Sequence, residues 1–283
     1  MRPIALLTTL NEAYLPQLLV LLTSLHVNNP GETFCLYLIH RSFRPETLEQ
    51  LGQDCAQLSV KLVALKVDET LFTGAPVSRQ YPQEMYYRLL APCLLPPELD
   101  RVIYLDPDIL VINPIRPLWE TDLQGNLFAA AAHTGKTELA NDFNRFRLKT
   151  EHQYYNSGVL LIDLERGREE IRPEELFAYA REHPRELILP DQDILNILYG
   201  NRILALDDYI WNYDARNFSS YLLRSSGQAD LDWVVSHTAI LHFCGRAKPW
   251  KAHYRHRFGL LYKHYARLTD RFFSADPERK RNE

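Results

Sequence analysis

Strand-like and helix-like segments alternate from the start of this chain, and that alternation is the strongest constraint on its fold. Apolar runs typical of strands cover residues 4–10, 33–40, 60–67 and 101–105, and helical patterns cover residues 14–25, 44–58 and 84–95. Further strands are expected at 127–133, 158–164, 202–206 and 238–244, with helices at 172–183 and 191–200. The order predicts an α/β fold with a mixed, mostly parallel central sheet flanked by helices.

Composition excludes several classes of protein. The chain has 283 residues, 46% hydrophobic and 24% charged, which is ordinary for a globular protein. A net charge of −4 argues against nucleic-acid binding. The four cysteines lack CxxC spacing and are expected to be reduced thiols in a cytoplasmic protein. The apolar run 15–25 is too short to span a bilayer.

Two aspartates interrupt the apolar stretch VIYLDPDILVI, residues 102–112. Asp106 and Asp108 follow the predicted strand 101–105, and ligands of such sheets bind beyond the carboxyl ends of the strands. One interpretation is a turn, for which Asp-Pro-Asp is well suited. The other is a divalent-metal site, since hard cations bind carboxylate oxygens and can hold a diphosphate.

An apolar strand followed by D-x-D is typical of two classes of enzyme. In haloacid dehalogenase-type phosphatases the first aspartate, here Asp106, is a nucleophile, and LALDD and AAAHT resemble other parts of those enzymes. Leu110 stands where that motif has Thr or Val, and the motif usually lies nearer the start of the chain. In sugar-nucleotide glycosyltransferases the D-x-D binds Mn²⁺ and the donor diphosphate.

The stretch HFCGRAKPW, residues 242–250, favours the second class. His242 at a strand end is by itself more often a packed histidine than a ligand. Gly245 permits close approach of a backbone, and Lys248 is a cation suited to phosphate. Together with Asp106 and Asp108 they would complete a site for a metal and a diphosphate.

Five motifs occur in the order seen in glycosyltransferase family 8, and residues 4–262 resemble that family: YYRLL, DRVIYLDPDILVINPI, YYNSGVLLIDL, LPDQDIL and HFCGRAKPW. The resemblance implies a GT-A nucleotide-diphospho-sugar transferase fold and a UDP-sugar donor. It also implies Mn²⁺, with Mg²⁺ as a substitute, and retention of anomeric configuration. A hexose, glucose or galactose, would pass to a saccharide or lipid-linked glycan acceptor.

The resemblance also implies roles for single residues. Asp106, Asp108 and His242 would bind the metal, and Asp106 would also contact the ribose. Lys248 and Gly245 would contact the diphosphate.

A second group of residues would act at the donor sugar. Arg88 and Asn156 would contact or orient it, although a helix-surface arginine and a turn residue are their alternatives. Asp191, Gln192 and Asp193 match the D-Q-D of the family and, with Arg88 and Asn156, would be the catalytic residues; helix capping is the alternative for the D-Q-D.

The first strand departs from the family pattern. The stretch LTTLNEAY has Thr9 and Leu10 where the family often has two aspartates, and Glu12 where it has a tyrosine for uracil. Asn11 matches, so Thr9 and Asn11 are expected on the ribose side of the nucleotide. Tyr14 would take the place of the family tyrosine that stacks on uracil.

The last part of the chain differs in composition. Residues 1–245 are expected to form the catalytic domain, and residues 246–283 a basic, aromatic helical segment packed on it. That segment has 11 Lys and Arg against 4 Asp and Glu. One interpretation is that it lies on the anionic inner face of the cell membrane. The other is that it forms a capping helix with a solvated charged face. A non-catalytic sugar-nucleotide-binding protein is a further alternative for the whole chain.

Overall fold

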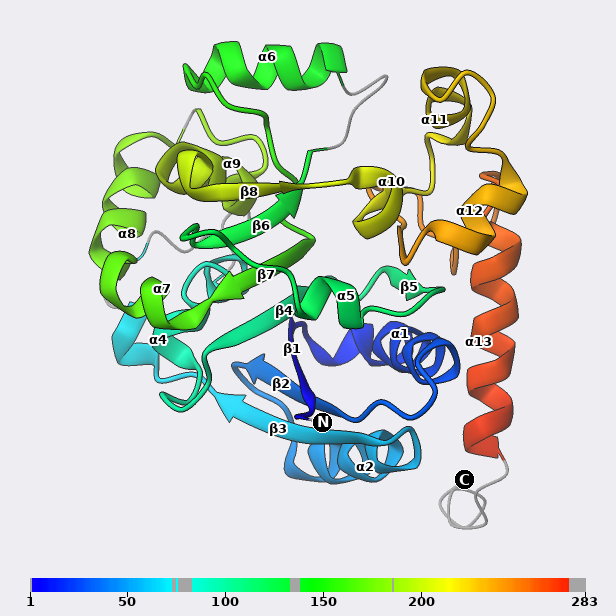
Figure 1. Ribbon diagram of the computed structural model, residues 1–283. Coiled ribbons are helices and arrows are strands. Elements are labelled where there is room, and N and C mark those ends of the chain that lie inside the picture. The colour runs from blue at the N-terminus through cyan, green and yellow to red at the C-terminus, as the bar shows by residue number, and fades with distance from the viewer. Residues whose placement is uncertain (1, 73–74, 76–82, 133–137, 185, 275–283) are drawn as a thin grey trace.

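A seven-stranded sheet forms the centre of the computed structural model, which describes residues 2–72, 75, 83–132, 138–184 and 186–274 (Figure 1). Its strand order is β3-β2-β1-β4-β7-β6-β8. The strands are β1 (Ile4–Thr9), β2 (Phe34–His40), β3 (Val60–Lys66), β4 (Arg101–Leu105), β6 (Phe128–Ala131), β7 (Val159–Asp163) and β8 (Ile203–Leu206). Among the described strands of this sheet, β7 alone runs antiparallel to its neighbours. The predicted mixed, mostly parallel sheet is confirmed.

Helices cover both faces of the sheet, because its central strands are apolar on both sides. In β1, Ile4 and Leu6 pack with α1 (Leu15–Asn28) and α2 (Pro45–Gln57). Ala5 and Leu7 point to the other face. That face packs against the remaining large group of helices: α3 (Glu84–Tyr87), α4 (Ala91–Leu94), α7 (Leu164–Glu170), α8 (Pro173–Glu182) and α9 (Pro190–Tyr199).

The predicted helix over residues 84–95 is wrong as a single element. The chain forms α3 and α4 as two separate short helices. Pro92 has no N–H to donate to the carbonyl four residues earlier, so a continuous helix would lose a hydrogen bond there. Pro92 lies instead in the first turn of α4, where that loss costs nothing.

A second, three-stranded sheet has the order β5-β10-β9. Its strand β5 contains the apolar residues that follow Asp108. Strand β5 (Ile109–Val111) pairs antiparallel with β10 (Ile240–His242), which pairs in parallel with β9 (Tyr213–Asp214). The stretch 102–112 is therefore two strands in two sheets. The short link between β4 and β5 carries both aspartates.

The remaining helices lie around these sheets. They are α5 (Arg116–Trp119), α6 (Glu138–Leu148), α10 (Asp208–Trp211), α11 (Phe218–Arg224) and α12 (Leu231–His237), with short 3₁₀ turns η1 (Glu12–Tyr14), η2 (Glu69–Phe72) and η3 (Gly200–Arg202). In Figure 1, α6 and α9 lie at the end of the sheet where β6 and β8 are placed.

Helix α13 (Gly259–Ser274) closes the described chain and runs along α1 (Figure 1). Tyr265 and Phe273 are buried on its inner side, and the Asn28 side chain of α1 donates a hydrogen bond to the Tyr265 hydroxyl at 2.7 Å. Lys263, Arg267 and Arg271 recur every four residues on its exposed side. Across the described residues, every helix is too short or too polar to cross a membrane.

Candidate active site

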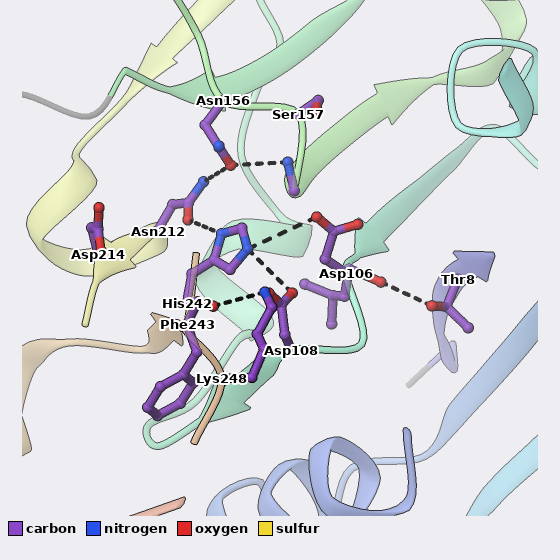
Figure 2. A network of polar contacts seen from close by, with 12 residues as sticks. Thr8, Asp106, Asp108, Asn156, Ser157, Asn212, Asp214, His242, Phe243 and Lys248 are labelled. Atoms are coloured by element: carbon purple, nitrogen blue, oxygen red, sulfur yellow. Dashed lines mark hydrogen bonds and ion pairs between the residues drawn. The ribbon is translucent and has the colours of Figure 1, made fainter. Parts of the chain in front are cut away.

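Asp106, Asp108 and His242 meet where the two sheets join (Figure 2). Asp106 directly follows β4, Asp108 directly precedes β5, and His242 ends β10. The Nε2 atom of His242 lies 3.3 Å from a carboxylate oxygen of Asp108 and 3.8 Å from one of Asp106. One potential ligand atom from each residue lies within 4.8 Å of the others.

This cluster fits a divalent cation. Two carboxylate oxygens and one imidazole nitrogen suit Mn²⁺ and are acceptable to Mg²⁺. Asp108 and His242 are buried, with 7% and 3% of their surfaces exposed, so their ligand atoms are held by packing. Burial alone would raise the pKa of Asp108. The charges of His242 and Lys248 outweigh burial and lower this pKa well below its usual range. The carboxylate is therefore ionised, as a metal ligand must be.

One oxygen of the Asp106 carboxylate is held by two neighbours. The Tyr104 hydroxyl donates to it at 2.6 Å, and the Arg88 guanidinium lies 3.2 Å away. The second oxygen faces His242. Tyr104 was not predicted as a site residue, because a tyrosine inside a strand reads as core.

Gly158 leaves the space that the cluster needs. A Cβ atom on Gly158 would lie 2.3 Å from the His242 ring and 2.7 Å from an Asp106 oxygen. The Gly158 carbonyl also accepts a hydrogen bond from the backbone N–H of Asp106 at 2.9 Å. The glycine of the NSG stretch is therefore a site residue that sequence reasoning missed.

Arg88 connects the metal-ligand cluster to the D-Q-D helix. Its guanidinium lies 3.0 Å from a carboxylate oxygen of Asp191 and donates to the Ser157 carbonyl at 3.1 Å. Burial opposes its charge, but Asp106 and Asp191 raise the pKa of Arg88 above its usual range. A permanently charged guanidinium beside the metal ligands can bind an anionic or hydroxyl-rich ligand.

A chain of side-chain amides lies behind the cluster. The side-chain NH₂ group of Asn156 donates to the side-chain oxygen of Gln192 at 2.9 Å. The side-chain oxygen of Asn156 accepts from the NH₂ group of Asn212 at 2.9 Å. Asn212 then contacts Nδ1 of His242 at 2.9 Å (Figure 2). The structure thus brings the predicted residues Asn156 and Gln192 together with the metal ligands. Asn212, from WNYD, carried no signal in the sequence.

Lys248 and Gly245 follow β10 on the same side. The Lys248 ammonium forms an ion pair with Asp108 and donates to the Phe243 carbonyl at 3.0 Å. Gly245 has a positive φ of 81°, a conformation that favours glycine. Lys248 thus lies beside the Asp106–Asp108–His242 cluster, and Gly245 follows β10 three residues after His242.

A cleft of about 450 Å³ opens beside the cluster. It is lined by Thr9, Leu10, Asn11, Tyr14, Glu84, Arg88, Asp106, Pro107, Asp108 and Lys248. The Asn11 side chain accepts a hydrogen bond from the Ala13 N–H, and Glu12 pairs with Arg44 outside the cleft lining. Tyr14 is 38% exposed, so its ring is accessible to a ligand. Of the departures at the first strand, Thr9 and Leu10 therefore line this cleft, whereas Glu12 does not.

Asp193 is held in a different environment from the other predicted catalytic residues. Its carboxylate is fully buried and accepts hydrogen bonds from Arg147 at 2.7 Å and Tyr154 at 2.6 Å. The backbone N–H groups of Ile188 and Leu189 occupy its other oxygen. These contacts bind α6 to the start of α9 and give Asp193 a structural role, and its catalytic role stays a prediction.

The sheet order and the Asp106–Asp108–His242 cluster define the class of this protein as a glycosyltransferase with a GT-A fold. The profile of glycosyl transferase family 8 matches residues 5–253. The chain belongs to this family. The predicted family, fold and enzyme class are thereby confirmed.

Individual relatives agree with this assignment. General stress protein A of Bacillus subtilis (strain 168) is 30% identical over 241 residues, which are 83% of this chain and 82% of that protein. The lipopolysaccharide 1,2-glucosyltransferase of Escherichia coli (strain K12) is 26% identical, covering 84% of this chain and 70% of that protein. The structure of galactosyltransferase LgtC in complex with donor and acceptor sugar analogues superposes with a TM-score of 0.76 at 22% identity, covering 94% of this chain and 96% of that one.

Gly158→Ala is expected to disrupt the cluster. The added methyl group would collide with His242 and Asp106, which costs about 1–3 kcal/mol in a packed interior. Mn²⁺ binding, measured by titration calorimetry, should weaken at least about 10-fold because two ligands are displaced. The control is Gly52→Ala in α2, where the new methyl group meets open space. Unchanged Mn²⁺ affinity in Gly158→Ala would contradict this account.

Asp193→Asn and Arg147→Leu are expected to have matching effects. Each breaks the same buried ion pair, so each should lower the free energy of unfolding by about 3–5 kcal/mol in urea denaturation. Any loss of transferase activity should be of similar size in both variants. Abolished activity in stably folded Asp193→Asn, with near-normal activity in Arg147→Leu, would support a catalytic role for Asp193.

Proposed function

We propose that this protein is a retaining hexosyltransferase that moves glucose or galactose from a UDP-sugar to a saccharide or lipid-linked glycan. The observation that carries the proposal is the Asp106–Asp108–His242 cluster beside an open cleft, in a chain of glycosyl transferase family 8. A bound Mn²⁺ or Mg²⁺ ion would stabilise charge on the leaving diphosphate.

The cleft lining supports a nucleotide-sugar donor. Thr9 and Asn11 are suited to hydrogen bonds with the ribose, and the accessible ring of Tyr14 is suited to stacking on the base. Lys248 neutralises Asp108 in the structure and is available to diphosphate oxygens at the same position. The positive φ of Gly245 would place its N–H near the same group.

The sugar would lie beside Arg88 and the start of the D-Q-D helix. Arg88, Asn156 and Gln192 form one connected set of donors and acceptors around Ser157. Such a set fixes a substrate in one orientation. Asp191 is paired with Arg88, and this pairing orients both side chains.

Retention of configuration is proposed to occur by attack of the acceptor from the same face as the leaving group. A covalent intermediate would need a nucleophile on the other face of the sugar. Gln192 carries an amide, which is a poor nucleophile, and the carboxylate of Asp193 is fully occupied. The departing phosphate oxygen is then the base that deprotonates the acceptor hydroxyl.

The alternatives are less well supported. A haloacid dehalogenase-type phosphatase needs Asp106 as a free nucleophile, whereas one Asp106 oxygen is held by Tyr104 and Arg88 and the other faces His242. Family membership also argues against that class. A non-catalytic sugar-nucleotide-binding protein would bind UDP without turning over any UDP-sugar.

Release of UDP from a panel of UDP-sugars tests the proposal without knowledge of the acceptor. We expect slow, Mn²⁺-dependent hydrolysis of UDP-glucose or UDP-galactose, lost in EDTA. Asp108→Ala should reduce it by about 100-fold or more, since it removes a metal ligand.

The matched control is Asp232→Ala, an exposed aspartate in the second half of another D-x-D sequence. It should hydrolyse like wild type. Wild-type protein that binds UDP but hydrolyses no UDP-sugar would support the non-catalytic alternative. Hydrolysis that persists in EDTA would contradict the metal role.

We also propose that α13 contacts an anionic membrane surface through Lys263, Arg267 and Arg271, which would bring a lipid-linked acceptor to the enzyme. The three residues are exposed and lie on one side of the helix. Each basic residue near an anionic surface contributes about 1 kcal/mol.

Charge reversal of all three residues to Glu should lower the affinity for phosphatidylglycerol vesicles by about 100-fold. The affinity is measured by co-sedimentation. The control reverses three exposed lysines elsewhere, Lys61, Lys66 and Lys149, with the same change in net charge. Equal losses in both variants, or no loss in the first, would contradict a membrane contact through α13.

A further inference from the structure

Asn212 occupies a buried position behind the His242 ring, on the side away from Asp106 and Asp108 (Figure 2). It is the last link of the amide chain from Gln192 through Asn156. We propose that Asn212 is a positioning residue that fixes His242 with its proton on Nδ1, so that Nε2 is presented to the metal. This inference rests on the metal role proposed above.

Backbone N–H groups fix the direction of every hydrogen bond in the amide chain. The N–H of Gly158 donates to one side-chain atom of Asn156 at 2.9 Å, so that atom must be the oxygen Oδ1. A backbone N–H can only donate, which removes the usual ambiguity between amide oxygen and nitrogen. The atom of Asn212 that contacts the same Oδ1 at 2.9 Å must therefore be its NH₂ group.

The other end of the chain gives the same direction independently. The N–H of Ser157 donates to Gln192 at 3.2 Å, so the contacting atom is Oε1. Asn156 approaches the same Oε1 at 2.9 Å and must present its NH₂ group there. Two backbone donors thus fix Asn156 in one orientation from both sides.

The remaining atom of Asn212 then determines the state of the histidine. Its Oδ1 lies 2.9 Å from Nδ1 of His242 and can only accept, so Nδ1 must carry a proton. Without a metal, the charges of Asp106 and Asp108 favour a second proton on the other nitrogen, Nε2; a bound metal ion would replace that proton, and Nε2 would then present its lone pair. That nitrogen is the one directed at Asp108 and Asp106, at 3.3 Å and 3.8 Å.

The position of Asn212 in the fold explains why this contact is rigid. Asn212 directly precedes β9, which pairs in parallel with β10 and so lies beside His242. The absence of a side chain at Gly158 leaves the space that the ring occupies. A histidine held in this way resembles metal-binding histidines generally, whose second nitrogen is oriented by an outer partner.

Mn²⁺ binding to the full-length protein tests the inference without any need for turnover. Free Mn²⁺ is measured by electron paramagnetic resonance in wild type, Asn212→Leu and Asn212→Asp. Leu has a similar size but no acceptor, so affinity should fall about 10–100-fold. Asp keeps an acceptor for the Nδ1 proton but loses the donor to Asn156 Oδ1, so affinity should fall less than in Asn212→Leu.

Asn217→Leu is the matched control. Asn217 binds Asp214 through its amide at 2.8 Å and does not belong to the amide chain. It should bind Mn²⁺ like wild type. Wild-type affinity in folded Asn212→Leu would overturn the inference. So would equal losses in Asn212→Leu and Asn217→Leu, or a loss in Asn212→Asp as large as that in Asn212→Leu.

The tautomer can also be observed directly, which keeps the inference testable if Asn212→Leu does not fold. Long-range ¹H–¹⁵N correlation spectra of metal-free wild type, at a pH where the His242 ring is neutral, should show the proton on Nδ1. His242→Gln assigns the signal. A proton on Nε2 would overturn the inference. Because this spectrum needs no metal, absence of Mn²⁺ binding would contradict the proposed function and leave this test intact.

Discussion

Two carboxylates placed two positions apart, between two buried strands, require positive charge nearby, and the site is organised by that requirement. Asp106 lies beside Arg88, and Asp108 pairs with Lys248. Both face His242. These partners come from two other parts of the chain, Arg88 and the stretch 242–248, so the electrostatic need of one link between strands positions two distant segments. A divalent cation would satisfy the same need and allow Lys248 to serve a diphosphate.

The topology delivers those partners. Because β7 runs antiparallel beside β4, the stretch Asn156–Gly158 enters the sheet where β4 ends, and the Gly158 carbonyl accepts from the Asp106 N–H. Because β10 pairs with β5, His242 is carried to the position beside Asp108. The two sheets therefore meet at the acid–histidine cluster, and the amide chain from Gln192 to Asn212 braces it from behind.

Much of this could be predicted from the chain itself. The strands of the main sheet follow from continuous apolar runs, and Asp106 and Asp108 were expected at the end of the fourth. The helix over 84–95 was not predicted correctly, because its apolar spacing outweighed the effect of Pro92. Asp193 matched a motif, yet its neighbour Arg147 lies far away in sequence, and no local pattern reveals a buried ion pair of that kind.

The sequence by itself determined the alternation of strands and helices, the family, and the types of residue at the site, because these depend on local periodicity and on short motifs. Only the tertiary structure decided which of those residues cooperate. Gly158 and Asn212 acquire their roles from contacts with residues distant in the chain. Hydrogen-bond direction and steric space are properties of such contacts, and they exist only once the two sheets have met.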